Sequence, residues 1–298
     1  MTQNDTELDP RDHPNVDVYG VIGNPVAHSL SPIIHQHFAQ QTQQNIHYGK
    51  LFSEINQFEQ TVETFFRHGG KGLNVTVPFK SKAFALCSQL SELAQAAGVV
   101  NILWQDNGQY VGDNSDGLGL VRDIKNSQSN IKNKNILLLG AGGAVQGVVL
   151  PFLQELPRTI VIANRTIEKA QNIVDRFKDQ AKQLNINLRA IALQQLEQET
   201  NPFDIIINGT STGLEQVSPL TDQQVKHLSN NTSNQLAYDM VYGKTTIFMQ
   251  QMKDQGIQVK DGLGMLVEQA AVAFEVWRGI ATQHLLNTKI ILDNLNKN

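Results

Sequence analysis

The chain has 298 residues, of which 40% are hydrophobic and 17% are charged, and its formal net charge is −4 at pH 7. This length is enough for about two domains with cores of their own. No apolar run approaches the roughly 18–20 residues that span a bilayer, which argues against a membrane protein. The chain also lacks a lysine–arginine run, which argues against a nucleic-acid partner. An anionic ligand must therefore be held by a few well-placed cations.

The first 15 residues are polar and slightly acidic. They resemble neither a signal peptide nor a transit peptide, and we expect them to form a disordered extension. The single cysteine, Cys87, cannot form an internal disulfide, which fits a reducing cytoplasm.

From residue 16 to about residue 115, strand and helix signals alternate as in an α/β unit. Ser31 followed by Pro32 predicts a helix whose N-cap is Ser31. Asn107-Gly108 predicts a two-residue hairpin turn between strands over 99–105 and 109–114. The other expected elements are strands over 16–23, 46–52 and 71–77, a helix over about 57–68 and a long helix after Pro78.

Three continuous apolar runs follow, at 136–140, 159–163 and 204–208. Unbroken apolar runs are typical of strands buried on both faces of a parallel sheet, and the polar helical segments between them indicate a doubly wound fold. After Tyr242 we expect two helices, roughly 264–278 and 281–296. The first is strongly apolar, so it should pack against the N-terminal domain.

The first of these runs opens into closely spaced glycines, Gly140, Gly142 and Gly143. Such a turn lets backbone amides approach a pyrophosphate at a helix N-terminus. Val145 stands where the usual third glycine of this motif would be. The second strand ends in Asn164-Arg165-Thr166 rather than in a carboxylate. Because an arginine and a hydroxyl can bind a 2′-phosphate that a carboxylate would repel, the sequence predicts an NADP site.

With these landmarks in place, the chain resembles the shikimate dehydrogenase family from about Tyr19 to its C-terminal helices. The stretches that carry the resemblance are GNPVAHSLSPIIH (23–35), NVTVPFK (74–80), GVVNIL (98–103), GDNSDGLG (112–119), GAGGAVQG (140–147), NRT (164–166), NGTSTG (208–213), YDMVY (238–242) and DGLGMLVEQA (261–270).

The resemblance implies reversible, NADPH-dependent reduction of 3-dehydroshikimate to shikimate, on the route to chorismate and the aromatic amino acids. It also implies an α/β substrate domain joined by two helical linkers to a Rossmann domain, with the active site between them. We expect residues 16–118 plus 262–298 to form the substrate and catalytic domain, and 119–261 to form the NADP-binding domain.

Hydride transfer to a ketone requires a proton partner for the oxygen. Lys80, where the strand of NVTVPFK gives way to a helix, is our candidate, with Asp116 as its companion. By resemblance these two residues match the family's catalytic lysine and aspartate. Asp116 is also a plausible helix N-cap before GLGL, and it can serve both purposes.

The resemblance also supplies the candidate substrate contacts, with Ser29 and Ser31 as carboxylate-binding serines. Without the resemblance, Ser31 is a helix N-cap, and Asn74 and Asn101 are buried amides that tie strands together. A buried amide at Gln269, in an apolar helix, needs hydrogen-bond partners, which a bound hydroxyl could supply. The matched substrate positions are Ser29, Ser31, Asn74, Thr76, Asn101, Tyr242 and Gln269.

For the cofactor, the glycine turn with Ala144 should hold the pyrophosphate, and Asn164, Arg165 and Thr166 the 2′-phosphate. Lys169, one helical turn beyond Arg165, either adds a second charge there or is simply solvated. Four further residues match family positions that border the nicotinamide, although methionine at such positions is more often plain core. They are Thr210, Met240, Gly262 and Met265.

The spacing of His28, His35 and His37 matches no zinc pattern, and we expect no metal. We interpret His35 and His37 as surface residues of a helix, and assign no role to His28. Two rival functions remain: a quinate/shikimate dehydrogenase, and a non-catalytic protein that senses NADP(H) on the same fold. For each of these functions we expect the protein to be a monomer or a homodimer.

Overall fold

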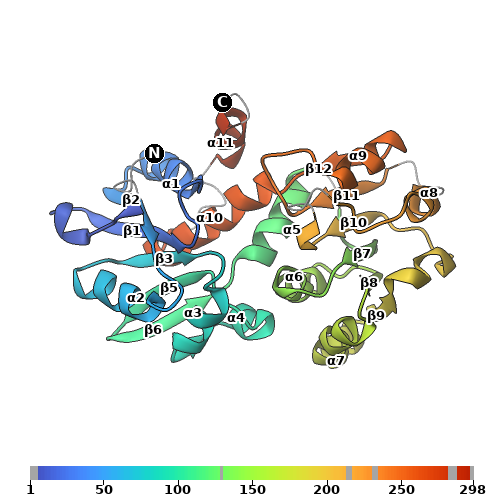
Figure 1. Cartoon of the computed structure of the whole chain (residues 1–298), viewed down its shortest axis with the longest axis horizontal. Coiled ribbons are helices and arrows are strands. Elements are labelled where there is room, and N and C mark those ends of the chain that lie inside the picture. Colours follow the sequence, from blue (N-terminus) through green and yellow to red (C-terminus); the bar gives the residue numbers. More distant parts are fainter. Residues whose placement is uncertain (1–5, 128–129, 213–216, 230–233, 281–286, 296–298) are drawn as a thin grey trace. The chain divides into compact units, whose positions relative to one another are not determined.

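The computed structural model describes residues 6–127, 130–212, 217–229, 234–280 and 287–295. The chain forms two compact units, one made of Met1–Gly119 with Val267–Asn298 and the other of Leu120–Leu266 (Figure 1). We expected the domain boundaries at 118/119 and 261/262, and the two units divide at 119/120 and 266/267, within helices α5 (Asp116–Asn126) and α10 (Leu263–Arg278). Every described helix is too short or too polar to span a bilayer.

The first unit is built on a six-stranded sheet with the order β2-β1-β3-β5-β6-β4. The sheet is mixed, because β1 runs parallel to β2 and β3 whereas β5 pairs antiparallel with β3 and β6. Its strands are β1 (Asp17–Gly23), β2 (Ile46–Phe52), β3 (Gly72–Val75), β4 (Gln89–Leu90), β5 (Ile102–Asp106) and β6 (Gln109–Asp113). Its helices, besides parts of α5 and α10, are η2 (Pro10–Asp12), α1 (Ser31–Thr42), α2 (Phe58–Arg67), α3 (Lys80–Leu86), α4 (Glu92–Ala97) and α11 (Thr288–Leu295).

Both faces of this sheet are covered. Val18 and Ile22 of β1 belong to a buried apolar cluster with α2, α3 and α4. The alternate residues Tyr19 and Val21 point to the other face, where Trp277 packs against them. Helices α1 and α10 lie on this face of the sheet (Figure 1). This alternation follows from the two-residue period of a strand. Helix α10 therefore returns to the N-terminal sheet, as the sequence predicts.

The hairpin between β5 and β6 is confirmed at Asn107-Gly108, where φ is 49° and 78°. Positive φ at both central residues is the geometry of a type I′ turn, which Asn-Gly favours.

Two expectations for this unit are wrong. The segment after Pro78 is not one long helix, because α3 ends before Cys87 and the chain forms the short strand β4 before Ser91 caps α4. The N-terminal residues that the structure describes pack against the first unit and do not form a disordered extension. Leu8 is buried in the cluster with α2, and Oδ1 of Asp9 lies 3.2 Å from Nδ1 of His68.

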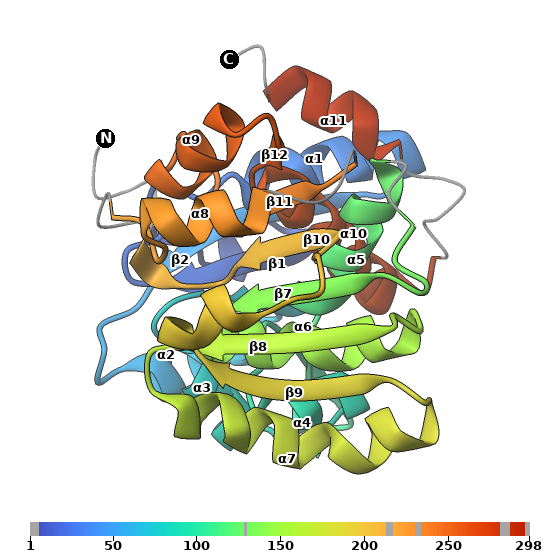
Figure 2. The ribbon, with the colours of Figure 1, turned by 90° about the vertical axis from the view of Figure 1, so that its right-hand side faces the viewer.

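The second unit carries a sheet whose strands all run parallel in the order β12-β11-β10-β7-β8-β9 (Figure 2). Counted from β9, this is the 3-2-1-4-5-6 order of a dinucleotide-binding fold. The strands are β7 (Asn135–Leu139), β8 (Thr159–Asn164), β9 (Asn187–Ala192), β10 (Ile205–Asn208), β11 (Leu236–Asp239) and β12 (Gln258–Lys260). The helices are α6 (Gly143–Gln154), α7 (Ile167–Gln183), η3 (Leu193–Gln198), α8 (Asp222–Ser229) and α9 (Ile247–Asp254).

The three strands predicted from apolar runs are buried: every residue of β10 is buried, and β7 and β8 are buried except at their ends. Helices α8 and α9 pack on one face through Val225, Leu228 and Phe248. The strands β9, β11 and β12 and the helices η3, α8 and α9 were not predicted from the sequence. The start of α9 nevertheless has a sequence signal, because the Thr246 side chain accepts a hydrogen bond from the amide of Met249 as an N-cap. The expected helix 281–296 is described only from Thr288, because 281–286 and 296–298 lie outside the described residues.

Val145 departs from the usual glycine motif, and the fold accommodates it at the end of the neighbouring strand. Val145 is fully buried, and a Cβ added to Gly209, directly after β10, would lie 2.6 Å from Val145 Cγ2. The glycine that allows α6 to approach the sheet is therefore Gly209 rather than residue 145.

We expect Gly209→Ala to lower the free energy of unfolding by about 1–3 kcal/mol through overpacking. Denaturant unfolding checks whether Gly209 and Val145 compete for the same space. It is measured for this variant, for Val145→Ala and for the double variant. The double variant should lose less than the sum of the two single losses, because the smaller side chain makes room for the new methyl. Additive losses would show that the two residues do not compete for the same space.

Candidate active site

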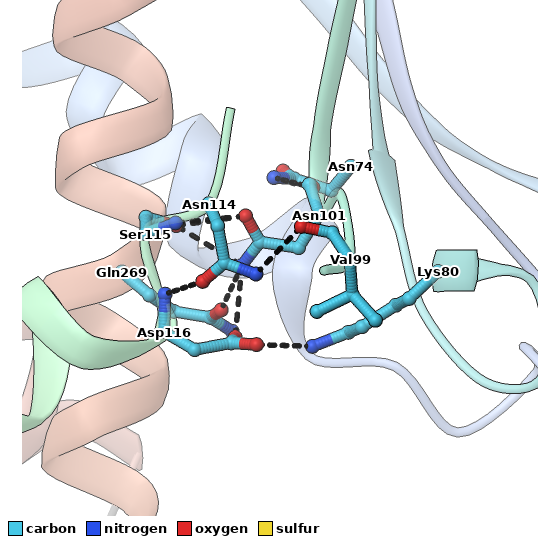
Figure 3. A network of polar contacts seen from close by, with 8 residues as sticks. All are labelled: Asn74, Lys80, Val99, Asn101, Asn114, Ser115, Asp116 and Gln269. Atoms are coloured by element: carbon cyan, nitrogen blue, oxygen red, sulfur yellow. Dashed lines mark hydrogen bonds and ion pairs between the residues drawn. The ribbon is translucent and has the colours of Figure 1, made fainter. Parts of the chain in front are cut away.

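The structure brings the two predicted catalytic side chains together. Lys80 is the first residue of α3, shortly after β3 ends, and Asp116 is the first residue of α5. The Nζ of Lys80 donates to Oδ2 of Asp116 over 2.6 Å (Figure 3). The side chain of Lys80 is 29% exposed and that of Asp116 is 10% exposed. The ammonium group is thus shielded by protein but still reachable from outside.

Asn101, just before β5, holds the other side of this pair. Its Nδ2 donates to Oδ1 of Asp116 over 2.8 Å and to Oε1 of Gln269 over 3.0 Å (Figure 3). Its Oδ1 accepts from the amide of Ser115 over 2.9 Å. The side chain is buried, so its hydrogen bonds fix the Asp116 carboxylate with one oxygen toward Asn101 and the other toward Lys80. Asn101 is therefore both a tie between elements and part of the site.

Asn114 was not among the predicted site residues, and it has the capping role that we considered for Asp116. Its Oδ1 accepts from the amide of Asp116 over 3.1 Å, and its Nδ2 donates to the carbonyl of Val99 over 3.3 Å (Figure 3). Asp116 itself is the first helical residue rather than the N-cap. Because Asn114 satisfies the amide at the start of α5, both carboxylate oxygens of Asp116 are available to Lys80 and Asn101. An asparagine two residues before a helix is the signal that could have found it.

The predicted carboxylate-binding serines lie next to each other, and the N-cap interpretation of Ser31 is wrong. Ser31 is the first residue of α1, and the preceding Leu30 makes no side-chain capping bond. The Oγ of Ser29 is 3.2 Å from the Oγ of Ser31 and accepts from the Ser31 amide over 3.3 Å. Two adjacent hydroxyls at the start of a helix can donate to a carboxylate.

The other predicted substrate contacts fall into two groups. Asn74 and Thr76 lie at the end of β3, where Asn74 Nδ2 donates to the carbonyl of Asn101 over 3.2 Å and the Thr76 amide donates to the carbonyl of Ile22 over 3.0 Å. They therefore lie near Asn101 and the catalytic pair. Tyr242 belongs to the other unit and is 36% exposed.

The interpretation of His35 as a surface residue is wrong. Its ring is fully buried on the inner side of α1, stacked on Tyr48 with 4.0 Å between ring centroids. Burial lowers the pKa of His35 to about 3. His37 is partly exposed and His28 is exposed. Among the described residues, no group of three or more His, Cys, Asp or Glu side chains is arranged to hold a metal ion.

In the second unit, the glycine turn has the shape that a pyrophosphate requires. The chain leaves β7 through Gly140, whose φ is +105°, and α6 begins at Gly143. A Cβ placed on Gly142 or Gly143 would meet no atom within 4 Å, so the space in front of the helix is open. Across the switch point between β7 and β10, a Cβ on Gly140 would lie 3.0 Å from Thr210. Open space at a helix N-terminus beside a switch point fits a dinucleotide.

The end of β8 fits a 2′-phosphate. The Nδ2 of Asn164 donates to the carbonyl of Thr166 over 2.8 Å and so fixes the turn into α7. Arg165, Thr166 and Lys169 are exposed, and the strand ends in Asn164 rather than in a carboxylate that would repel a phosphate. Ala144, in the first turn of α6, is also exposed.

Thr210, one of the residues predicted to border the nicotinamide, is held by buried polar side chains that were not predicted. Thr210 Oγ1 donates to Oδ1 of Asn208 over 2.7 Å, and Asn208 Nδ2 donates to Oδ2 of Asp239 over 3.1 Å. Asn208 and Asp239 are both fully buried at the carboxyl ends of β10 and β11. Their signal in the sequence is a polar residue that closes an apolar run.

Met240, Gly262 and Met265 belong to the same unit as Thr210. A Cβ on Gly262 would lie 2.3 Å from the carbonyl oxygen of Met240, so only glycine permits this approach. The amide of Met265 donates to the hydroxyl of Tyr238 over 3.3 Å. Both methionines are partly exposed rather than plain core.

A parallel sheet in this order, with an open glycine turn at its switch point, defines the class of dinucleotide-dependent oxidoreductases. Family models agree: the shikimate dehydrogenase substrate binding domain matches residues 21–103, the shikimate / quinate 5-dehydrogenase model matches 122–241, and the shikimate 5′-dehydrogenase C-terminal domain matches 262–281.

Comparisons with individual proteins identify the family within this class. The chain is 48% identical over 266 residues to the shikimate dehydrogenase (NADP(+)) of Herminiimonas arsenicoxydans, a match that covers 89% of this chain and 93% of the relative. An Ael1 enzyme from Pseudomonas putida is similar in structure, with a TM-score of 0.83, 40% identity and coverage of 94% and 98%. So is shikimate 5-dehydrogenase from Thermus thermophilus in complex with NADP(H) and shikimate, with a TM-score of 0.77, 28% identity and coverage of 92% and 96%. The chain belongs to the shikimate dehydrogenase family.

Proposed function

We propose that the chain catalyses the reversible, NADPH-dependent reduction of 3-dehydroshikimate to shikimate. The observation that carries this proposal is the 2.6 Å contact between Lys80 and Asp116, held on its other side by Asn101 and Gln269. These residues lie in the unit that contains the match to a substrate binding domain. Its family membership places the reaction in the shikimate pathway, which leads to the aromatic amino acids.

Lys80 moves the proton of the reacting oxygen. In the direction of reduction its ammonium group donates a proton to the ketone oxygen as that oxygen gains negative charge, and in oxidation the amine takes the hydroxyl proton back. Asp116 holds the Nζ in place and stabilises its charge. When bound, NADPH supplies the hydride that the carbonyl carbon accepts. Thr210, Met240, Gly262 and Met265 would border its nicotinamide ring.

Substrate and nucleotide would be held by residues of different chemistry. Ser29 and Ser31 would bind the substrate carboxylate, and the amides of Asn74, Asn101 and Gln269, with Thr76 and Tyr242, its hydroxyls. Gly140, Gly142, Gly143 and Ala144 would cradle the pyrophosphate, while Asn164, Arg165, Thr166 and Lys169 would hold the 2′-phosphate. The protein would act as a monomer or a homodimer.

The rival substrate is quinate, because one matching family model covers shikimate and quinate dehydrogenases alike. Steady-state oxidation of shikimate and of quinate, each with NADP+ and with NAD+, distinguishes the two activities. The absorbance of the reduced nicotinamide reports the rate. For each alcohol we expect kcat/KM with NADP+ to exceed that with NAD+ by at least about tenfold, since Arg165 favours the 2′-phosphate, and we expect shikimate to be oxidised faster than quinate. Faster oxidation of quinate with NAD+ would assign the protein to the rival activity.

A further inference from the structure

The amide of Asn74 is held by a tyrosine behind it. The hydroxyl of Tyr48 donates to Oδ1 of Asn74 over 2.7 Å, while Nδ2 of Asn74 donates to the carbonyl of Asn101 over 3.2 Å. A phenol donates one hydrogen bond, and an amide nitrogen has two hydrogens. These contacts therefore fix which end of the Asn74 amide faces Tyr48, and they leave Nδ2 with a second hydrogen to offer.

Tyr48 is itself fixed by the surrounding rings. It lies in β2, is 8% exposed and stacks on His35 with an interplanar angle of 6°. The ring of Trp277 lies beside it, with 6.4 Å between the ring centroids. Among the described residues, neither ring nitrogen of His35 makes a hydrogen bond within 3.5 Å.

Both stacked rings are neutral. Burial lowers the pKa of His35, and the nearby Asn74 side chain, which raises it, is the weaker influence. Burial also raises the pKa of Tyr48 well above its usual value. His35 therefore offers Tyr48 a flat, uncharged surface, and the Tyr48 hydroxyl keeps the proton that it donates to Asn74.

The Tyr48 hydroxyl is also close to the second substrate-binding group. Ser31, one of the two serines proposed to bind the carboxylate, lies near enough to lower the pKa of Tyr48, against the larger effect of burial. Ser31 and His35 lie one helical turn apart in α1, and His35 is the residue on which the Tyr48 ring rests. One hydroxyl thus lies behind both Asn74 and Ser31.

We propose that Tyr48 is a positioning residue for the substrate. Its hydroxyl turns Oδ1 of Asn74 away from the substrate, so that Asn74 offers an N–H donor and selects a ring hydroxyl that accepts a hydrogen bond. This inference rests on the proposed function, because it takes Asn74 to be a substrate contact. It adds a residue that acts only through Asn74 and Ser31 and does not touch the substrate.

The variant Tyr48→Phe removes the hydroxyl and keeps the ring on His35. Because one neutral hydrogen bond is lost, we expect the Kd and KM for shikimate to rise about tenfold. We expect kcat and the Kd of NADPH to stay within about twofold, because the contact is the same in ground and transition states. Calorimetric titration with shikimate gives the Kd independently of turnover.

Tyr19→Phe is the matched control. Tyr19 is the register partner of Tyr48 on β1, is 3% exposed and stacks on Trp277, but its hydroxyl accepts from Arg278 instead. Its loss should leave the shikimate Kd unchanged. An equal rise in both variants, or no rise in Tyr48→Phe, would overturn the inference, whereas a wild-type protein that fails to oxidise shikimate would overturn the proposed function.

Two further variants test the route through Asn74. In an Asn74→Ala background, adding Tyr48→Phe should raise the Kd for shikimate by less than it does in the wild type, because the amide that Tyr48 orients is gone. Asn74→Asp keeps an acceptor for Tyr48 but loses the N–H donor, and it should weaken shikimate binding at least as much as Tyr48→Phe. An Asn74→Asp protein that binds shikimate as tightly as the wild type would contradict the proposed orientation, even if Tyr48→Phe did not fold.

Discussion

Replacing Lys80 by methionine is expected to lower kcat for shikimate oxidation by about three orders of magnitude, the usual range of a lost general acid–base group. Methionine keeps an apolar stem of similar length but has no proton to give or take. Asp116 keeps its bond from Asn101, so the site should otherwise persist. The Kd of NADPH should hardly change, because the predicted nucleotide residues all belong to the unit Leu120–Leu266.

Steady-state kinetics and fluorescence titration with NADPH measure both quantities. Lys82→Met is the control, because Lys82 is two residues further along α3 and its Nζ donates to the backbone carbonyl of Ile55. That variant should retain kcat within about twofold. A Lys80→Met protein with wild-type turnover would remove Lys80 from the mechanism.

Replacing Arg165 by glutamine is expected to weaken NADPH binding by one to two orders of magnitude while leaving NADH binding almost unchanged. Hydrogen bonds to charged groups contribute about 1.5–3 kcal/mol, and only NADPH carries the 2′-phosphate. Because Arg165 is exposed, the difference should shrink as salt is added. Fluorescence titration with each nucleotide, at low and at high salt, measures these affinities.

The matched control is Arg158→Gln. Arg158 is also exposed, but it precedes β8 and so lies at the opposite end of that strand from Arg165. The loss of its charge should change neither the affinity for NADPH nor the affinity for NADH. Equal losses of NADPH and NADH affinity in Arg165→Gln would contradict a 2′-phosphate site at this position.

All strands of the first sheet except β4, and the strands β7, β8 and β10 of the second, could be predicted from the sequence because their signals are local. The unbroken apolar run of β7 and the Asn107-Gly108 turn each depend on neighbouring residues alone. The errors arose where a distant partner decides the outcome. His35 is buried because Tyr48, on the next strand, and the distant Trp277 complete an aromatic cluster around it. Leu8 is buried, against the expectation for the N-terminal segment, because α2 provides an apolar surface for its side chain.

The same distinction applies to the site. Lys80 and Asp116 were predicted through their motifs, but their 2.6 Å contact joins residues 36 positions apart and needed the fold. Asn114, Asn208, Asp239 and Tyr48 were not predicted because each supports another residue of the site. Such supporting residues have no chemistry of their own that a short motif displays.

Hydride transfer to 3-dehydroshikimate, with the proton supplied by Lys80, is tested most directly by a single turnover with NADPH that carries deuterium at both C4 positions. Mass spectrometry then reports where the label goes and how fast it arrives. We expect shikimate with one deuterium on the new carbinol carbon, formed by the wild-type protein and, about three orders of magnitude more slowly, by Lys80→Met. Shikimate without deuterium, or equal rates in the two proteins, would contradict this mechanism.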